Sequence, residues 1–128
     1  MIVKGISHKS PKKVAMQKLI RYVFAPEKLV DKKLNRNQLI VKRNIRGYDP
    51  EKWADLFQKN DANRTFEHKK RTVLRHEIVS FSPEDNSKIT REILQDIAKW
   101  YLKNRSNSMG VCGVHWEKSI HLHFVISG

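Results

Sequence analysis

The sequence predicts an α+β fold, in which helices cover a mainly antiparallel sheet that ends in a histidine-bearing hairpin. Strand-like and helix-like segments alternate along the chain, and only a short turn separates the last two strand-like segments. The length of 128 residues fits one compact domain, residues 1–128. Alternating crossover-type connections leave a doubly wound parallel sheet as the alternative, but the final hairpin favours the antiparallel arrangement.

The strand-like segments are short runs rich in β-branched residues and bounded by turn residues. They are expected at residues 1–7, 38–45, 72–81, 109–116 and 120–127. The last two form the hairpin, with its turn around residues 117–119.

Three helices are expected between these strands, at residues 11–25, 50–63 and 88–104. Ser10 and Asp49 stand at capping positions, and each is followed by a proline suited to a first helical turn. In the third helix, apolar residues recur at spacings of three and four, which predicts one buried stripe. Its members are Ile89, Ile93, Ile97, Trp100 and Tyr101.

The chain is strongly basic, with 26 Lys and Arg against 13 Asp and Glu and a net charge of +13. A folded domain this basic indicates a polyanionic partner, and the apolar content of 39% is too high for a disordered basic tail. The residues expected to contact nucleic acid are Lys12, Lys13, Arg43, Arg46, Lys69, Lys70, Arg71 and Arg75. Aromatic side chains available for base stacking, if exposed, are Tyr48, Trp53, Phe66 and Trp116.

The single cysteine, Cys112, excludes an internal disulfide framework and a zinc finger with several cysteines. It is expected to be a small buried residue in a reducing compartment. No apolar run approaches the roughly 20 residues that a membrane span needs. We therefore expect a cytoplasmic protein.

Three of the six histidines lie close together near the end of the chain, at His115, His121 and His123. In a strand, His121 and His123 point to the same face, with Leu122 turned to the other. If His115 pairs with His121 across the turn, all three imidazoles share that face. Such a set suits a divalent metal and leaves coordination positions open for water or a phosphate oxygen. The alternative is that these are ordinary histidines of a half-exposed sheet.

Residues 113–127, which contain this histidine pattern, resemble the third motif of plasmid mobilisation relaxases, the HUH endonucleases named for histidine-hydrophobe-histidine. Residues 76–85 resemble the histidine-bearing strand of that family and its Ser-Phe turn, which an amphipathic helix follows. Residues 19–23 resemble the segment that holds the nucleophilic tyrosine. The resemblance covers most of the chain. Glu117 departs from it, because the family commonly has Asp at this position.

The resemblance implies the N-terminal nickase domain of a relaxase, in a truncated or minimal form. Such an enzyme nicks single-stranded or melted DNA at a transfer origin and transfers the strand through a 5′-phosphotyrosyl intermediate, with accessory mobilisation proteins as further partners. The resemblance also implies Tyr22 as the nucleophile and His115, His121 and His123 as ligands of a divalent metal, Mg²⁺ or Mn²⁺. Glu117 and His76 would orient those ligands.

Three alternatives stay open. Tyr48 is a second candidate nucleophile, whereas Tyr101 belongs to the expected buried stripe. The chain also fits a non-catalytic DNA-binding module on the same fold. A small HUH replication initiator is disfavoured, since its tyrosine would lie on a helix after the histidine motif and no tyrosine follows His123.

Overall fold

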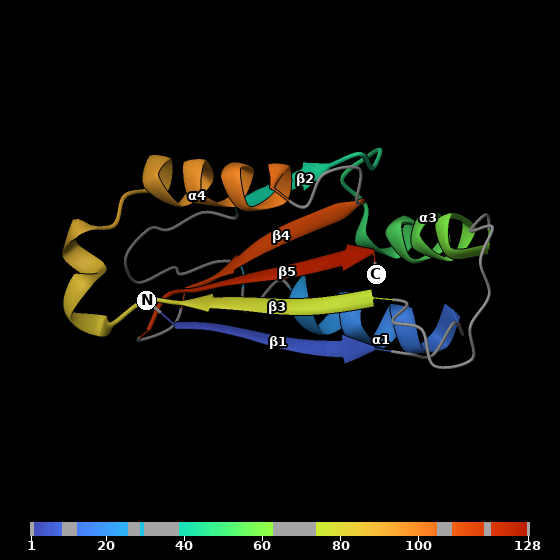
Figure 1. Cartoon of the computed structure of the whole chain (residues 1–128), viewed down its shortest axis with the longest axis horizontal. Coiled ribbons are helices and arrows are strands. Elements are labelled where there is room, and N and C mark those ends of the chain that lie inside the picture. Colours follow the sequence, from blue (N-terminus) through green and yellow to red (C-terminus); the bar gives the residue numbers. More distant parts are fainter. Residues whose placement is uncertain are drawn as a thin grey trace.

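The computed structural model describes residues 2–8, 13–25, 29, 39–62, 74–104, 109–116 and 119–127. Its elements are β1 (Ile2–His8), α1 (Lys13–Val23), β2 (Ile40–Arg43), α3 (Pro50–Ala62), β3 (Leu74–Ser80), the 3-10 helix η1 (Pro83–Lys88), α4 (Arg91–Lys103), β4 (Gly110–His115) and β5 (His121–Ser127) (Figure 1).

The five strands form one sheet in the order β1-β3-β5-β4-β2, and every neighbouring pair is antiparallel. This arrangement confirms the predicted α+β class and rules out the doubly wound parallel sheet. Sequence neighbours β4 and β5 form the expected terminal hairpin. Strand β5 lies at the centre of the sheet (Figure 1), so the residues it carries have strands on both sides.

Helices cover both faces of the sheet. On one face, Met16 and Ile20 of α1 and Phe57 of α3 belong to a core cluster with Val111 and Val125 of the sheet. On the other face, Leu94, Ala98 and Leu102 of α4 pack with Leu122, Phe124 and Ile126 of β5, among others. Alternate residues of each strand therefore point to different helices. We call these the α1 face and the α4 face.

The helix starts have identifiable caps. The Asp49 carboxylate accepts a hydrogen bond of 3.0 Å from the Glu51 amide at the start of α3, as predicted. The Thr90 hydroxyl accepts one of 3.2 Å from the Ile93 amide. Because Thr90 has an extended backbone, α4 begins at Arg91 rather than at Lys88, and the preceding residues form the separate helix η1. Ser10 lies outside the described residues.

The prediction of one buried stripe in the third helix was wrong by one residue. The buried side chains of α4 are Leu94, Ala98 and Leu102, whereas Ile93 is 42% and Trp100 65% exposed. The other predicted members, Ile89, Ile97 and Tyr101, are partly buried. Both sets recur every three or four residues, so the spacing alone does not choose between them. The close approach of α4 to the sheet at Gly110, where an added Cβ would lie 2.7 Å from Leu102 Cδ2, orients the helix.

The second strand is shorter than expected. It spans Ile40–Arg43 and stops before Asn44, whose φ of 59° is a left-handed conformation that extended strands do not contain. The other strand boundaries agree with prediction to within one or two residues. None of the helices in the described ranges is long and apolar enough to cross a membrane.

Candidate active site

Five of the described side chains on the α1 face of the sheet are histidines. Strand pairing sets their common orientation: His115 of β4 lies opposite His121 of β5, and His123 of β5 lies opposite Ile78 of β3, two residues from His76. His8 of β1 shares this face through its pairing with Leu74. The parity argument therefore placed His115, His121 and His123 on one face correctly.

The histidine rings are in contact rather than merely on one side. The His115 and His123 rings stack with centroids 3.7 Å apart. The His76 ring lies 5.2 Å from that of His123, and its Nε2 is 2.9 Å from His123 Nδ1. Since two nitrogens at this distance must share one hydrogen, one of these imidazoles donates to the other. The partly buried His121 ring lies 5.9 Å from that of His123.

Tyr22 lies over this cluster. It is the second-to-last residue of α1, and its ring meets the rings of His76, His115 and His123 edge-on, with each centroid 6.1 Å away. The side chain is 48% exposed. A phenol is thus held against three imidazoles and is still reachable from solvent.

The end of α1 is tied to the site by a second contact. His115 Nε2 lies 2.6 Å from the carbonyl oxygen of Val23, the last residue of the helix. Because a carbonyl only accepts, the His115 ring carries its hydrogen on Nε2 and donates it. This bond satisfies one of the carbonyls that a helix end leaves without an intrahelical partner.

The start of β5 is fixed from the neighbouring strand. The Phe81 amide donates a hydrogen bond of 3.0 Å to the carbonyl of Ile120, and the Ser119 hydroxyl donates to the carbonyl of Phe81. These bonds hold the chain just before His121 against the end of β3.

His76, expected only to orient the metal ligands, is itself a buried member of the histidine cluster. It is 4% exposed, and burial, together with the nearby His8 and His115, lowers its pKa to about 4. The ring is therefore neutral at neutral pH. His8 was missed altogether: its ring lies 6.3 Å from that of His76, and its buried Nε2 has no hydrogen-bond partner in the part of the chain that the structure describes. The only available signal was parity in β1, which becomes useful only once β1 is known to pair with β3.

The donor set suits a metal, although the side chains are not arranged around one. Among the described residues, no three His, Cys, Asp or Glu side chains have their ligand atoms gathered for an ion. His115, His121 and His123 nevertheless share one face, and neutral imidazole is a common ligand for divalent metals. The residues present therefore fit the group that the resemblance implies.

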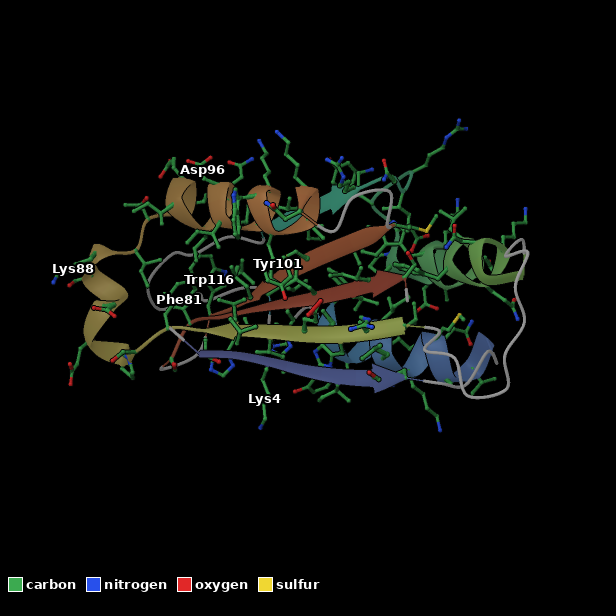
Figure 2. The ribbon with its side chains drawn as sticks, viewed as in Figure 1. Lys4, Phe81, Lys88, Asp96, Tyr101 and Trp116 are labelled. Carbon is green, nitrogen blue, oxygen red and sulfur yellow. The ribbon has the colours of Figure 1, made fainter. Side chains whose placement is uncertain are left out.

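The other candidate nucleophiles lie elsewhere. Tyr48 is exposed, with the ammonium group of Lys42 4.0 Å from its ring centroid. Tyr101 extends from α4 on the α4 face (Figure 2). It stacks on Phe124 at 4.3 Å and donates a hydrogen bond of 2.9 Å to the buried carboxylate of Glu77. Burial raises the pKa of the Cys112 thiol, which keeps that residue protonated. Among Tyr22, Tyr48, Tyr101 and Cys112, the side chain in contact with the histidine rings is that of Tyr22.

The basic residues expected to contact nucleic acid are only partly described. Arg46 is exposed after β2, while Arg43 and the exposed Arg75 lie on the α4 face, away from the histidines. Lys13 begins α1. Lys12, Lys69, Lys70, Arg71 and Glu117 lie outside the described residues, as does Phe66. Trp53 is fully buried and is not available for base stacking, whereas Trp116 is partly buried.

The fold and this site define a domain with a histidine-hydrophobe-histidine pair on the central strand of an antiparallel sheet and a tyrosine over it. The family model described as "Relaxase: MobA/VirD2-like, nuclease domain" matches residues 22–128. The chain therefore belongs to the MobA/VirD2-like relaxase nuclease domain family, whose members nick DNA during mobilisation. No curated protein and no solved structure gives a significant match.

Proposed function

We propose that this domain nicks single-stranded DNA at a specific site by attack of Tyr22 and transfers the strand through a 5′-phosphotyrosyl intermediate. The observation that carries the proposal is the position of the exposed Tyr22 ring, edge-on to His76, His115 and His123. The DNA is that of a transfer origin, the reaction takes place in the cytoplasm, and accessory mobilisation proteins are further partners.

In this reaction the Tyr22 oxygen bonds to the scissile phosphorus, and the bond from phosphorus to the 3′ oxygen breaks. The tyrosine loses its proton and the leaving oxygen gains one, which gives a free 3′-hydroxyl. A free tyrosine hydroxyl ionises only near pH 10, so it needs help from its surroundings. The buried His76 ring lies edge-on to the Tyr22 ring, but its pKa, lowered to about 4, makes it a weak base, so the phenol proton passes to solvent rather than to His76. Because the phosphodiester is conserved in the adduct, attack by a 3′-hydroxyl reverses the step.

His115, His121 and His123 would hold the divalent ion, Mg²⁺ or Mn²⁺, which when bound neutralises charge on the non-bridging oxygens of the phosphate. His76 positions His123 through the 2.9 Å contact of their nitrogens. The carbonyl of Val23 fixes the tautomer of His115. These two contacts are of the kind that orients metal-binding histidines in other proteins. Glu117 is proposed in the same role.

The test of Tyr22 is a covalent-capture experiment with a pool of random single-stranded oligonucleotides, because the nick sequence is unknown. Wild-type protein is incubated with the pool and Mn²⁺ or Mg²⁺, and adducts are isolated on a denaturing gel and sequenced. Tyr22→Phe should form no adduct and bind DNA as before, since the half-exposed ring stays in place and at most about 1 kcal/mol of folding free energy is lost with one hydrogen bond.

The matched controls are Tyr48→Phe and Tyr101→Phe, which should both form the adduct. An adduct with Tyr22→Phe but none with Tyr48→Phe would move the nucleophile to Tyr48. Binding of DNA with no adduct from any version, wild type included, would favour the non-catalytic DNA-binding module.

The metal proposal is tested with the same gel. Removal of divalent ions with a chelator should abolish the adduct, and Mn²⁺ or Mg²⁺ should restore it. His121→Ala should need a higher metal concentration than wild type, because one ligand is lost from the set. Adduct formation at full yield in excess chelator would contradict metal dependence.

The proposed DNA contacts are Lys12, Lys13, Arg43, Arg46, Lys69, Lys70, Arg71 and Arg75. Each phosphate contact on single-stranded DNA should contribute about −0.7 to the slope of log K against log salt concentration. Fluorescence anisotropy over a salt series should therefore give a steep slope, reduced by about 0.7 in Arg46→Ala. An affinity independent of salt would mean that the charge of +13 serves another partner.

A further inference from the structure

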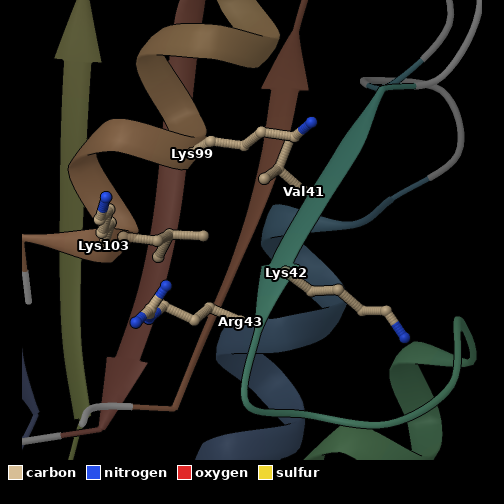
Figure 3. Close-up of a pocket in the computed structure, with 6 residues that line it drawn as sticks. Val41, Lys42, Arg43, Lys99 and Lys103 are labelled. Atoms are coloured by element: carbon tan, nitrogen blue, oxygen red, sulfur yellow. The ribbon is translucent and has the colours of Figure 1, made fainter. Parts of the chain in front are cut away.

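A positively charged cleft lies on the α4 face, between the edge strand β2 and helix α4 (Figure 3). Its volume is about 220 Å³. Within the described part of the chain, the residues that line it are four basic ones, two apolar ones and no acidic one: Val41, Lys42, Arg43, Lys99, Leu102 and Lys103. The histidine site lies on the other face of the sheet, so the cleft is separate from it.

Three of these basic residues line the cleft without a counter-charge among the described residues. Lys99 and Lys103 stand one turn apart on α4, a spacing at which like charges destabilise a helix, and Arg43 joins them from β2. In the ranges that the structure describes, none of the three takes part in an ion pair. Lys42 differs, since its ammonium donates a hydrogen bond of 2.8 Å to the carbonyl of Gly47 and points away from the other three (Figure 3).

Arg43 adds a second feature that suits an anion. Its Nε atom is buried and has no hydrogen-bond partner in the described ranges. An unpaired buried donor is costly, and a charged one more so. A phosphate oxygen in the cleft would accept this hydrogen and offset part of the positive charge.

Trp100 supplies an exposed aromatic surface on the same helix as two of the cleft lysines. It directly follows Lys99 and precedes Lys103 by one helical turn, and it is 65% exposed because Leu94, Ala98 and Leu102 already fill the core side of α4. Exposed aromatic rings next to cations are the elements with which proteins bind single-stranded nucleic acid, by base stacking and phosphate contact.

We propose that this cleft is a second contact for the single-stranded DNA substrate: Arg43, Lys99 and Lys103 bind a backbone phosphate, and Trp100 stacks on a neighbouring base. The inference rests on the proposed function for the identity of the strand. Strand β2 is the edge of the sheet and neighbours β4, which carries His115. A DNA strand leaving the histidine site can therefore reach the cleft by passing around β2.

The experiment measures affinity for a ladder of oligothymidylates of increasing length, which does not require the nick sequence. Wild-type affinity should rise with length and increase again once the strand reaches the cleft. In Lys99→Ala/Lys103→Ala, binding of short members should match wild type, whereas the increase at long lengths should disappear. The salt slope for long members should fall by up to about 0.7, because the cleft binds one phosphate. Trp100→Ala should lower the affinity for long members about 5- to 150-fold.

The matched control is Lys59→Ala/Lys88→Ala, which removes the same charge from exposed positions on α3 and η1. Equal length dependence in the cleft and control variants would overturn the proposal, as would an equal loss at all lengths. Inorganic phosphate is the third probe. If phosphate stabilised wild type against heat but not the cleft variant, and the cleft variant bound long DNA as wild type does, the cleft would be a small-anion site instead. Failure of the proposed function is distinct, because wild type itself would then form no adduct in the capture experiment.

Discussion

A methyl group added at Gly113 should destabilise the domain and disturb the position of Tyr22. Gly113 lies on β4 opposite His123. A Cβ built there would be 3.0 and 3.2 Å from ring carbons of Phe24 and 3.1 Å from Leu29 Cδ2. These distances are about 0.2–0.4 Å short of ordinary van der Waals contact, which begins at 3.4 Å.

The neighbours of Gly113 cannot easily move aside. The Phe24 ring packs edge-on against Trp53 with centroids 4.9 Å apart, and Trp53 is fully buried. Overpacking of this kind costs about 1–3 kcal/mol. Replacing glycine returns about 0.4–1 kcal/mol by reducing the entropy of the unfolded chain. Gly113→Ala should therefore lose about 1–2 kcal/mol, which for a domain of this size lowers Tm by roughly 4–8 °C.

The assay is urea unfolding together with the adduct gel. Gly5→Ala is the control. A Cβ added at Gly5 would meet no described atom within 4 Å beyond its chain neighbours, and the φ of Gly5 is not positive. This variant should therefore keep the stability of wild type or raise it slightly. Adduct yield should also fall in Gly113→Ala under conditions where it is folded, because Phe24 follows Tyr22 and Val23 directly. If Gly113→Ala were as stable as Gly5→Ala, the packing argument would be refuted.

Two further predictions concern the side chains below and opposite the site. Tyr101→Phe should lose about 1–3 kcal/mol in urea unfolding, because the buried Glu77 carboxylate loses its 2.9 Å hydrogen bond, and it should still form the adduct; equal stability to wild type would contradict this. The pKa of His76 is lowered from its ordinary value of 6.5 to about 4 in the folded state. Between these two pH values the unfolded state therefore binds more protons than the folded state, and stability should fall as the pH drops from 6.5 toward 4. With a chelator present, His76→Gln should weaken this pH dependence; identical pH profiles for His76→Gln and wild type would count against a buried neutral His76.

Much of the histidine site could be predicted because it depends on local geometry. A strand alternates its faces every residue, so His121 and His123 had to project together. The short turn then set the pairing that brings His115 opposite His121. The same holds for the Asp49 cap of α3, which requires only a side-chain oxygen two residues before an amide.

The remaining parts of the site depend on contacts distant in sequence. His8 and His76 approach each other because β1 pairs with β3, and no local pattern specifies that pairing. His76 reaches His123 because β5 is inserted between β3 and β4 in the sheet order. The prediction of the buried face of α4 failed for a related reason. Two sets of apolar residues satisfied the helical spacing, and the contact of Leu102 with Gly110 selected between them.

Helix α1 links the stability of the domain to its proposed chemistry. Met16, Ile20 and Val23 are buried in the core on one side of the helix, whereas Tyr22 lies at its exposed edge over the histidines. The carbonyl of Val23 accepts the hydrogen of His115, so the helix end and β4 are fixed to each other at the point where the phenol is held. Phe24, packed on Trp53, prevents that end from unwinding toward solvent. A substitution that loosens this packing should therefore move the tyrosine before it unfolds the sheet, because β5, which carries His121 and His123, is hydrogen-bonded on both sides.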